Sequence, residues 1–519
     1  MAEPFYITTA ISYPNGPPHI GHAYEAIATD AIARFQRLKG RDVFFLTGTD
    51  EHGLKMAQTA RERGLAPAEF AAEMSAKFRA MDDALNISYD RFIRTTEPAH
   101  HAASEAIWKA MADKGDLYLG RYEGWYSVRD EAYYGEEELV VAATGEKLSP
   151  QGSEVEWTVE ESWFFRLSAY QDRLLAHYDA EPGFIRPESR RNEVLRFVEG
   201  GLTDLSISRT SFDWGVKVPG SPNHVMYVWL DALTNYLTGI GYPDNAETYG
   251  RYWPADLHII GKDVVRFHAV YWPAFLMSAG IALPKQVFGH GWLLSRGEKM
   301  SKSVGNVVDP HDLIRAFGVD PLRYFLLREV TFGQDGGYTT EAIVAKVNAD
   351  LANSFGNLAQ RTLSFIARNL EGLPPPAGQG DPADDALLAQ VRETARTVLP
   401  RHFEALELSQ GIEAWLRAVF ACNQYIDAQA PWVLRRSDPE RMKAVLATLY
   451  EAIIDLAIAI QPIIPGSAAK LLDALGVPAA ERSYAALEDD GRYLRLAASG
   501  FTLAPPEPIF PRLEAPAEG

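Results

Sequence analysis

The N-terminal part of the chain alternates between two kinds of hydrophobic pattern. Residues Phe5–Ile11 are apolar and β-prone, a turn-forming stretch follows, and apolar positions then recur at helical spacing from Ala23 to Gly40. Asp42–Leu46 is a second apolar run, which the polar loop TGTDEHG follows. Strand, helix and strand within about fifty residues form a βαβ unit, which requires parallel pairing and a right-handed crossover. The pattern predicts a doubly wound α/β domain.

The pattern changes twice further along the chain. Short aromatic and acidic pieces between Asp116 and Asp213 are typical of a small β-rich insertion that splits the α/β domain. After Glu341 helical periodicity dominates, interrupted by a Pro- and Gly-rich loop at Glu371–Pro382, which predicts an all-α bundle ending in a proline-rich strip. The domains we expect are residues 1–115 and 214–290 for the two halves of the α/β domain, 116–213 for the insertion, 291–345 for a junction and 346–519 for the helical domain.

Composition and charge narrow the class of protein. Hydrophobic residues make up 47% and charged residues 23% of the 519 residues, the balance of a globular chain. Fifty Lys and Arg against 69 Asp and Glu give a net charge of −19, so any nucleic acid must meet a local basic patch. Cys422 is the single cysteine, which excludes an intramolecular disulfide and a multi-thiolate zinc site and fits the reducing cytoplasm.

No segment has the pattern of a signal peptide or a membrane span. The N-terminus lacks a basic stretch followed by an apolar one. The most apolar segment, Ala444–Ile464, carries Glu451 and Asp455 four residues apart, which places both on one face of an amphipathic helix. We therefore expect a cytoplasmic protein with no membrane contact.

The first candidate for chemistry is Pro18-His19-Ile20-Gly21-His22, directly after the first predicted strand. A helix that begins there presents unpaired N–H groups and the positive end of its dipole to the crevice above the sheet, where phosphates bind. His19 and His22 share a helical face and can donate to phosphate oxygens, and Gly21 leaves room for a nucleotide. Taken alone, the same residues also fit a turn before a helix with two incidental histidines.

The second candidate is Lys299-Met300-Ser301-Lys302-Ser303, in a loop rich in Lys, Ser and Gly. Such loops are commonly solvated surface segments, but this five-residue form occurs by chance in a chain of this length on the order of once in ten thousand. Two lysines on a loop can close over a triphosphate and neutralise departing pyrophosphate. We expect both lysines to take part in catalysis.

The two motifs, in this order, resemble those of the class I aminoacyl-tRNA synthetases. The stretches ITTAISYPNGPPHIGH, TGTDEHG, YVWLDALTNY, IGKDVVRFHAVYWPAF and HGWLLSRGEKMSKS resemble the methionyl branch of that family across nearly the whole chain. The resemblance implies a Rossmann-type domain that converts L-methionine and ATP, with Mg²⁺, to methionyl-adenylate and pyrophosphate. It also implies transfer of methionine to tRNA(Met), which carries the CAU anticodon, for translation initiation and elongation.

The resemblance assigns residues to each substrate. For ATP it implies Gly21, His19, His22, Lys262, Asp263, Lys299 and Lys302, of which His19, His22, Lys299 and Lys302 are catalytic. For methionine it implies Ile11, Tyr13, Asp50 at the α-ammonium, and Trp229, Ala232, Leu233, Tyr236, Phe267 and His268 around the side chain. Leu233 departs from the proline that many relatives have there. Lys262 and Asp263 fit the cap of the following helix equally well.

The chemistry of methionine suits an aromatic lining. A polarizable thioether favours aromatic surroundings, and a tyrosine hydroxyl and a neutral histidine can donate weakly to sulfur and so disfavour pure hydrocarbons. The aromatic residues also fit an ordinary core. We expect Trp229 and His268 in the pocket, and Trp272 and Phe275, which lie in an apolar run, in the core.

The helical domain carries candidate RNA contacts. Asn353, Asn357 and Arg361 recur every four residues, which predicts one helical face of groups that can bond base edges. Trp432 offers a flat ring on which a splayed base can stack. The resemblance implies that these four residues bind the anticodon. Without it, Asn357 fits helix packing and Trp432 fits the core.

Several expectations concern what the chain lacks. The stretch Arg121–Tyr134 has no Cys pair, so the insertion is similar to that of zinc-free members of the family, and we expect no metal held by protein side chains and no structural zinc. The insertion is too short for a large hydrolytic editing domain. Because no appended tRNA-binding module follows the helical domain, we expect a monomer.

Two other function classes compete with the ligase. One is a nucleotidyltransferase with the same HxGH junction that adenylylates a small acid without tRNA, which the long helical domain from Asn353 to Trp432 opposes. The other is an RNA-binding regulator with a decayed active site, which the intact His19, His22, Lys299 and Lys302 oppose.

Overall fold

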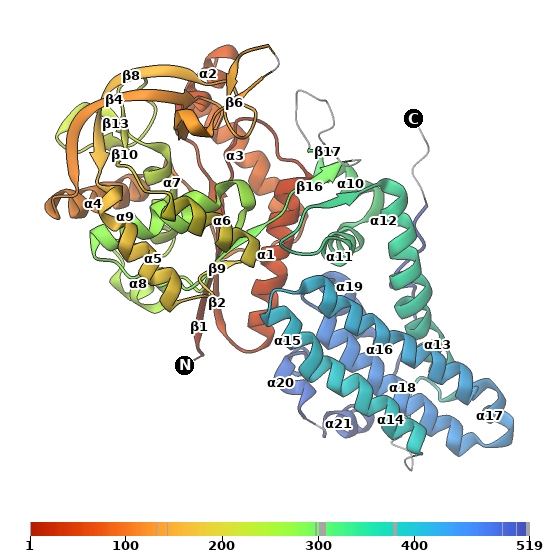
Figure 1. Cartoon of the computed structure of the whole chain (residues 1–519). Coiled ribbons are helices and arrows are strands. Elements are labelled where there is room, and N and C mark those ends of the chain that lie inside the picture. The colour runs from red at the N-terminus through yellow and green to blue at the C-terminus, as the bar shows by residue number, and fades with distance from the viewer. Residues whose placement is uncertain are drawn as a thin grey trace.

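The computed structural model has an α/β body at one end and a helical domain that extends away from it (Figure 1). It describes residues 2–130, 132–142, 144–295, 298–299, 308–376, 381–489, 491–504 and 506–514. The chain begins with β1 (Pro4–Thr9), α1 (Ile20–Leu38) and β2 (Asp42–Thr49). β1 and β2 pair in parallel from Pro4 opposite Asp42 to Thr8 opposite Leu46, so the βαβ prediction is confirmed.

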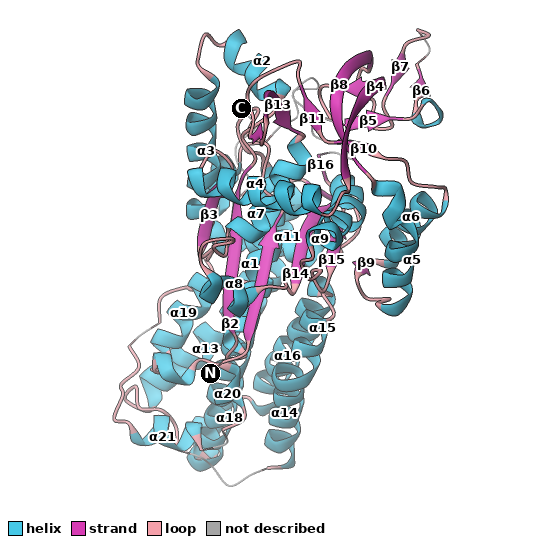
Figure 2. Ribbon diagram, turned by 90° about the vertical axis from the view of Figure 1, so that its left-hand side faces the viewer, coloured by secondary structure: helices cyan, strands magenta, loops and turns pink. Residues whose placement is uncertain are grey.

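A parallel sheet of six strands, counted within the described ranges, forms the centre of the α/β body (Figure 2). Its order is β3 (Arg91–Arg94), β2, β1, β14 (Leu257–Gly261), β15 (Val287–His290) and β9 (Ile185–Arg186). The chain leaves β1 toward β2 and β3 and later returns to the other side of β1 as β14. The strand order therefore reverses between β1 and β14, and ligands bind outside the carboxyl ends of strands at such a point.

Alternating residues of β1 face two different layers of helices. Phe5 and Ile7 pack with Ile27 of α1, whereas Tyr6 packs on the opposite face with Leu233 of α7 and Phe275 of α9. The other helices of this body are α2 (Leu54–Glu62), α3 (Pro67–Ala84), α4 (Pro98–Asp113), α7 (Val228–Thr238), α8 (Ala246–Tyr252) and α9 (Trp272–Ala279). Apolar cover on both faces is what a parallel sheet requires.

The insertion is built on a long antiparallel pair of strands. β4 (Leu117–Ser127) and β8 (Glu156–Phe165) pair from Leu117 opposite Phe165 to Tyr126 opposite Glu156. The shorter strands of the insertion are β5 (Ala132–Tyr134), β6 (Val140–Val141), β7 (Lys147–Leu148), β10 (Leu205–Ser206) and β11 (Ser208–Arg209). β12 (Lys217–Val218) and β13 (Ser221–Met226) lie beyond residue 213 but extend the same β-rich part, because β13 pairs antiparallel with both β11 and β12. The chain thus has the β-rich insertion that its aromatic pieces predict.

Part of the range 116–213 is not β-rich. It contains the helices α5 (Gln171–Ala180) and α6 (Glu188–Glu199), and β9 between them joins the edge of the central sheet by pairing with β15. The two helices are amphipathic, and each buries only two side chains: Leu174 and Tyr178 in α5, and Val194 and Val198 in α6. So short a stripe is easily missed among strongly aromatic neighbours.

A small junction connects the α/β body with the helical domain. β16 (Leu293–Ser295) pairs in parallel with β18 (Gly336–Tyr338) and antiparallel with β17 (Glu298–Lys299). The helices α10 (Pro310–Phe317) and α11 (Val319–Glu329) follow. Arg323 of α11 is fully buried, and its guanidinium lies 2.7 Å from the carboxylate of Asp30 on α1, which fixes the junction to the central layer.

The helical domain confirms the α-helical periodicity of the C-terminal part. Its helices are α12 (Thr340–Val347), α13 (Asn357–Asn369), α14 (Pro382–Glu393), α15 (Leu399–Glu404), α16 (Leu408–Gln429), α17 (Pro431–Ser437), α18 (Pro439–Ile460), α19 (Pro465–Ala474), α20 (Tyr484–Leu487) and α21 (Arg492–Ala498). α18 lies at the centre and is buried nearly all round. Asp455, on its expected polar face, is buried and paired with Arg492. Within the described ranges, no helix is both long and apolar enough to span a bilayer.

Candidate active site

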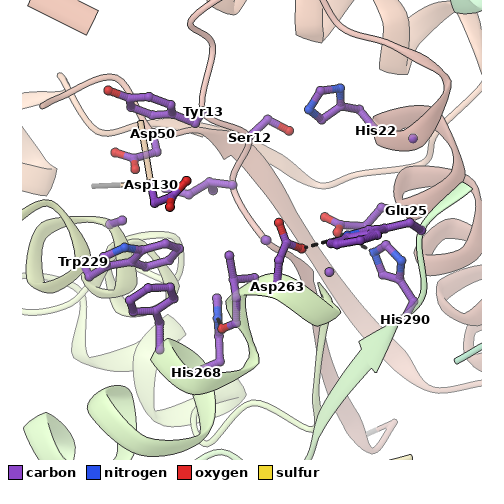
Figure 3. A pocket seen from close by; sticks show the side chains of 18 of the residues that line it. Ser12, Tyr13, His22, Glu25, Asp50, Asp130, Trp229, Asp263, His268 and His290 are labelled. Atoms are coloured by element: carbon purple, nitrogen blue, oxygen red, sulfur yellow. Dashed lines mark hydrogen bonds and ion pairs between the residues drawn. The ribbon is translucent and has the colours of Figure 1, made fainter. Parts of the chain in front are cut away.

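A cavity of about 460 Å³ opens at the carboxyl ends of β1 and β14, where the strand order reverses (Figure 3). Thirteen residues that the sequence assigns to ATP or methionine line it: Ile11, Tyr13, His19, Gly21, His22, Asp50, Trp229, Ala232, Leu233, Tyr236, Asp263, Phe267 and His268. They come from the loops after β1, β2 and β14, the start of α1, and one face of α7. Positions far apart in sequence therefore meet in one concave site.

The start of α1 is held by its own histidines. His19 is the N-cap, and its Nδ1 accepts a hydrogen bond from the N–H of Gly21 at 3.1 Å. The Nδ1 of His22 accepts one from the N–H of His19, also at 3.1 Å. Since both Nδ1 atoms accept, each neutral ring carries its proton on Nε2, where it is a donor. The capping role and the phosphate role are therefore compatible.

Gly21 is required by this arrangement. A Cβ at this position would lie 2.9 Å from Cε1 of His19, closer than side chains tolerate. The absence of a side chain lets the His19 ring fold back over the first turn of α1, where its centroid lies 3.9 Å from that of His22. The spacing HxGH thus specifies a compact pair of imidazoles at a helix N-terminus.

The loops after β1 and β2 bring Asp50 to the cavity. The N–H of Ser12 donates to the carbonyl of Gly48 at 2.9 Å, and the N–H of Asp50 donates back to the carbonyl of Ser12 at 2.8 Å. The hydroxyl of Tyr13 accepts from the N–H of Met56 at 3.2 Å, which holds that ring over the same loop. Asp50 is buried, so its carboxylate presents concentrated negative charge to the cavity.

The opposite wall is aromatic and uncharged. Trp229 and Phe267 stack face to face, with centroids 3.8 Å apart and planes 5° apart. Nδ1 of His268 lies 2.9 Å from the carbonyl of Val264, and its Nε2 lies 2.6 Å from the hydroxyl of Tyr236. A carbonyl only accepts, so the neutral ring carries its proton on Nδ1 and accepts the tyrosine proton at Nε2.

Burial keeps His268 neutral and Tyr236 protonated. Burial lowers the pKa of His268 to about 4, although the Val264 carbonyl opposes the shift. Burial likewise raises the pKa of Tyr236. The expected neutral histidine is therefore present, but its single N–H proton, on Nδ1, and the hydroxyl proton of Tyr236 both point to protein acceptors. The expected weak donation to sulfur is absent in this arrangement, whereas the indole N–H of Trp229 is buried without a hydrogen-bond partner in the described part of the chain.

The cavity also contains an ion pair that the motifs did not reveal. Nε2 of His290, at the end of β15, lies 2.7 Å from the carboxylate of Glu25 on α1, and Nδ1 lies 2.8 Å from the carbonyl of Gly291. Burial by itself would lower the pKa of His290, but the hydrogen bond and charge of Glu25 outweigh it, so the pKa is raised. Both ring nitrogens face acceptors, so this ring is a cation.

A sequence signal for this pair exists. Glu25 follows His22 by three residues and therefore shares its helical face, and His290 ends an apolar strand just before the KMSKS loop. Neither position suggests a partner until β15 is placed beside β14. The other lining residues that the sequence did not single out include Ser12, Asn15, Tyr24, Arg129, Asp130, Gln151, Asn235 and Trp292.

Lys262 and Asp263 lie side by side but face different surroundings. Asp263 lines the cavity, and its Oδ1 lies 3.4 Å from the indole nitrogen of Trp292. Lys262 lies outside this cavity, 2.7 Å from the carboxylate of Asp335 and 4.0 Å from the centroid of the Trp292 ring. No hydrogen bond from either side chain caps the short helix Lys262–Val264, so the capping alternative has no support.

The KMSKS motif is described only in part. The backbone of Lys299 belongs to β17, opposite Leu294 of β16. The side chain of Lys299 is not among the described parts of the chain. Residues 300–307, which include Lys302, lie outside the described residues altogether. β16 itself starts at the cavity, since Trp292 and Leu293 line it. The base of the motif therefore rises from the cavity wall.

Two of the candidate RNA contacts, Arg361 and Trp432, lie side by side in the helical domain. The guanidinium of Arg361 lies 5.3 Å from the centroid of the Trp432 ring and 2.6 Å from the carboxylate of Asp427. Trp432 is 44% exposed and Asn357 is exposed, which contradicts the core and packing alternatives. Asn353 lies in a π-helical segment, Asn348–Gly356. The three residues therefore do not belong to one regular α-helix, and the prediction that they share one α-helical face is wrong for Asn353.

Two further expectations concern the core and metal binding. Trp272 and Phe275 are fully buried and do not line the cavity, which confirms their place in the core. Within the described residues, no three His, Cys, Asp or Glu side chains form a cluster that could hold a metal ion.

Comparison with known proteins assigns the two parts of the chain separately. Residues 5–363 match the family described as tRNA synthetases class I (M), and residues 374–517 match the anticodon binding domain of methionyl tRNA ligase. A methionine–tRNA ligase of Brucella suis is 58% identical over 98% of each chain, and one of Mycobacterium tuberculosis is 57% identical over 99% of each chain.

Solved structures give the same result. The Mycobacterium tuberculosis methionyl-tRNA synthetase in complex with methionyl-adenylate superposes with a TM-score of 0.93 at 55% identity, covering 98% of this chain and 100% of that one. The free form of that enzyme superposes with a TM-score of 0.87 at 52% identity, covering 99% of each chain. The likeness therefore extends over both domains.

Proposed function

The chain belongs to the methionyl class I tRNA synthetases, and from that membership we propose which residues bind and activate each substrate. The enzyme is a methionine–tRNA ligase: L-methionine and ATP give methionyl-adenylate and pyrophosphate, and the methionyl group then passes to tRNA(Met). One observation carries the assignment of residues. A single cavity brings together the helix N-terminus at His19 and His22, the carboxylate of Asp50, and the neutral pair of Tyr236 and His268.

We place methionine across the aromatic end of the cavity. Asp50 binds the α-ammonium group, because a buried carboxylate is the strongest partner for a cation there. Ile11 and Tyr13 lie beside Asp50 and contact the amino acid backbone. The thioether lies among Trp229, Ala232, Leu233, Tyr236, Phe267 and His268, where aromatic faces suit a polarizable sulfur. The indole N–H of Trp229 is buried and has no hydrogen-bond partner in the described part of the chain, so we propose that it donates to the sulfur in place of Tyr236 and His268.

ATP takes the other end of the cavity. The Nε2–H donors of His19 and His22 and the dipole of α1 stabilise negative charge on the α-phosphate as the methionine carboxylate attacks it. Gly21 keeps the helix start open to the nucleotide. Glu25, His290 and Asp263 line the part of the cavity left for the ribose and base, where a carboxylate is a good acceptor for ribose hydroxyls.

Three lysines are proposed for the departing phosphates. Lys299 and Lys302 belong to a loop whose base starts at the cavity wall, so their charges can close over pyrophosphate. Lys262 forms an ion pair with the carboxylate of Asp335. To bind a phosphate, the ammonium group of Lys262 leaves this carboxylate and pairs with the phosphate. Mg²⁺ accompanies ATP, held mainly by phosphate oxygens and water as this ion prefers.

The anticodon end of tRNA(Met) is proposed to bind at the tip of the helical domain. Trp432 offers an exposed ring for stacking, and Arg361 beside it offers donors to a base edge or phosphate. Asn353 and Asn357 are both exposed and are proposed to add amide groups, Asn353 with its Oδ1 already accepting from the guanidinium of Arg512 at 2.8 Å.

We also propose that the enzyme is a monomer in the cytoplasm. Size-exclusion chromatography with light scattering tests the monomer, and fractionation of cells tests the compartment.

Pyrophosphate exchange with each of the twenty amino acids is the decisive test. Methionine alone is expected to support exchange, and charging is expected only for tRNA with a CAU anticodon. Adenylate formation without any tRNA charging would favour the nucleotidyltransferase, which the match to an anticodon-binding domain does not favour. Unchanged adenylate formation after His22→Ala would instead favour the regulator with a decayed site.

A further inference from the structure

The methionine site proposed above is built from two elements that are far apart in sequence. Asp50 lies in the loop that follows β2, whereas the aromatic wall is carried largely by one face of α7, which includes Trp229 and Tyr236 (Figure 3). An amino acid that contacts Asp50 with its ammonium group and this wall with its side chain spans both elements. The spacing between the loop and α7 therefore decides which length of side chain fits.

Behind the cavity wall, one buried carboxylate joins these two elements. Asp231 is fully buried on the opposite face of α7 and does not line the cavity. Its Oδ2 lies 2.7 Å from Nδ1 of His52, which follows Asp50 by two residues in the loop. Its Oδ1 lies 2.7 Å from Nε2 of His100 on α4. Asp231 thus connects α7 to the loop on one side and to α4 on the other.

The carboxylate of Asp231 is ionised. Burial by itself would raise the pKa of Asp231, but the charges and hydrogen bonds of His52 and His100 outweigh burial, so the pKa is far below its ordinary value. An ionised carboxylate only accepts, which places a proton on Nδ1 of His52 and on Nε2 of His100. Because breaking such a buried, hydrogen-bonded pair leaves a charge without its partner, the contact holds its geometry firmly.

The loop end of this contact is held by further hydrogen bonds. The carbonyl of Glu51 accepts from the indole N–H of Trp214 at 2.7 Å, and the N–H of Glu51 donates to the hydroxyl of Thr95 at 2.9 Å. The ring of His52 packs edge-on against that of Trp214, with centroids 5.3 Å apart. The backbone beside Asp50 is therefore rigid, and a shift of the His52 ring moves it.

Selectivity for the length of a side chain needs such a fixed spacing. A hydrophobic pocket distinguishes side chains that differ by one methylene by about 10- to 200-fold. A pocket whose ends move apart by about one ångström loses this selectivity, because it admits the longer side chain without a clash. Asp50 and Trp229 belong to separate elements, so the residues that contact the substrate do not set the spacing by themselves.

We propose that Asp231, through its pair with His52, sets the length of the methionine pocket and so excludes amino acids whose side chains are one methylene longer, such as ethionine. This inference rests on the proposed function and adds what determines the length of its substrate. Asp231 is a positioning residue, because it lies outside the cavity and acts by holding α7 at a fixed distance from the loop that carries Asp50.

The test measures pyrophosphate exchange with methionine and with ethionine. Asp231→Asn removes the charge at nearly unchanged size, and His52→Ala removes the donor on the loop. His52→Asn restores an N–H donor close to the position of Nδ1. Asp455→Asn breaks a buried ion pair with Arg492 in the helical domain and is the matched control for loss of stability. For each variant, kcat/KM for both amino acids, KM for ATP and the thermal midpoint are measured.

Asp231→Asn and His52→Ala are each expected to reduce the preference for methionine over ethionine about tenfold, because the pocket then distinguishes one methylene poorly. KM for ATP should stay within about twofold of the parent. His52→Asn is expected to recover most of the preference. The double variant should lose no more than either single variant, because both changes break one contact. Asp455→Asn should lower the thermal midpoint and leave the preference unchanged.

An unchanged preference in Asp231→Asn and His52→Ala would overturn the proposal. So would an equal loss of preference in Asp455→Asn, because general destabilisation would then explain the effect. If Asp231→Asn does not fold, the two His52 variants decide: equal preferences for His52→Ala and His52→Asn would overturn the proposal. Failure of the proposed function is a different result, because the parent enzyme would then show no methionine-dependent exchange at all.

Discussion

The two ends of the active-site cavity each contain one buried histidine, and one of these rings is neutral whereas the other is a cation. His268, at the end proposed for methionine, is 1% exposed and neutral, because its partners are a tyrosine hydroxyl and a backbone carbonyl. His290, at the end proposed for the nucleotide, is 6% exposed and cationic, because the carboxylate of Glu25 replaces the hydroxyl. Similar burial thus gives opposite shifts: the pKa of His268 falls to about 4, and the pKa of His290 rises.

The difference shows that the partner, more than burial, decides what a histidine can recognise. An uncharged wall suits the methionine side chain, since a buried cation there would have to be desolvated without a counter-charge. The nucleotide end holds its cation against a carboxylate, so the pair is neutral in sum but presents strong, fixed dipoles to polar groups. Five predictions break or sharpen this comparison.

The largest effect is expected for Asp50→Asn, which removes the charge proposed for the ammonium group. Loss of a buried charged partner costs roughly 3–5 kcal/mol, so kcat/KM for methionine in pyrophosphate exchange is expected to fall at least about a hundredfold. KM for ATP should stay within about twofold. Asp113→Asn, at the exposed end of α4, is the control. An equal rise in both KM values would contradict the division of the cavity into two ends.

Glu25→Gln is expected to act on the nucleotide end alone. Without the carboxylate His290 loses its proton, and the ribose end loses an acceptor, so kcat/KM for ATP should fall about thirtyfold to a hundredfold. KM for methionine is expected to remain near the parent value. The exposed change Glu105→Gln on α4 should leave both unaffected. A methionine-specific defect in Glu25→Gln would refute the assignment.

Trp432→Ala tests whether the cavity acts independently of the helical domain. Loss of one stacked base is worth about 1–3 kcal/mol, so kcat/KM for tRNA charging should fall about tenfold or more, while pyrophosphate exchange stays near the parent rate. Trp432→Phe keeps a ring and is expected to recover most of the charging. Loss of exchange in Trp432→Ala would mean that the two domains do not divide the reaction as proposed.

Tyr236→Phe sharpens the comparison by removing one hydroxyl. The Nε2 of His268 then loses its donor and becomes an unsatisfied buried acceptor, while the Val264 carbonyl keeps the proton on Nδ1, and KM for methionine should rise about fivefold to tenfold. Selectivity for methionine over its hydrocarbon analogue norleucine should fall as well. Tyr242→Phe, a tyrosine outside the cavity, is the matched control. A norleucine selectivity equal to that of the parent would show that the tyrosine–histidine pair plays no part in specificity.

The smallest effects are expected from pH, and they have opposite signs at the two ends. His290 has a raised pKa, so its stabilising contribution is full below the unfolded value near 6.5 and is lost as pH rises through the folded pKa. His268 has a lowered pKa, so its environment costs stability as pH falls from about 6.5 to about 4. Thermal midpoints of His290→Asn and His268→Asn across pH 5–8.5 check this. In a plot of the thermal midpoint against pH, His290→Asn should flatten the alkaline side of the curve and His268→Asn the acid side. Curves of the same shape for both variants would contradict the two charge states.

Much of the chemistry was predictable because it is local in sequence. A helix that starts at His19 after an apolar strand already specifies two imidazoles at a positive dipole, and the structure adds only that they also cap the helix. Trp432 at the start of a short helix was predictable as a candidate stacking surface for the same reason. The limits of the insertion were less predictable, because the edge strand Ile185–Arg186 is defined by its partner β15 and not by its own pattern.

The sequence by itself determined the βαβ start and the helical C-terminal domain, since hydrophobic periodicity depends on neighbours along the chain. The residues proposed for the methionine wall were predicted from the resemblance to the family. Only the tertiary structure decided that β1 lies beside β14, which brings Asp50, His268 and the start of α1 around one cavity. It also decided the charge of each buried histidine. The physical reason is that sheet order and hydrogen-bond partners are long-range contacts: Glu25 and His290 become a pair only when β15 takes its place in the sheet.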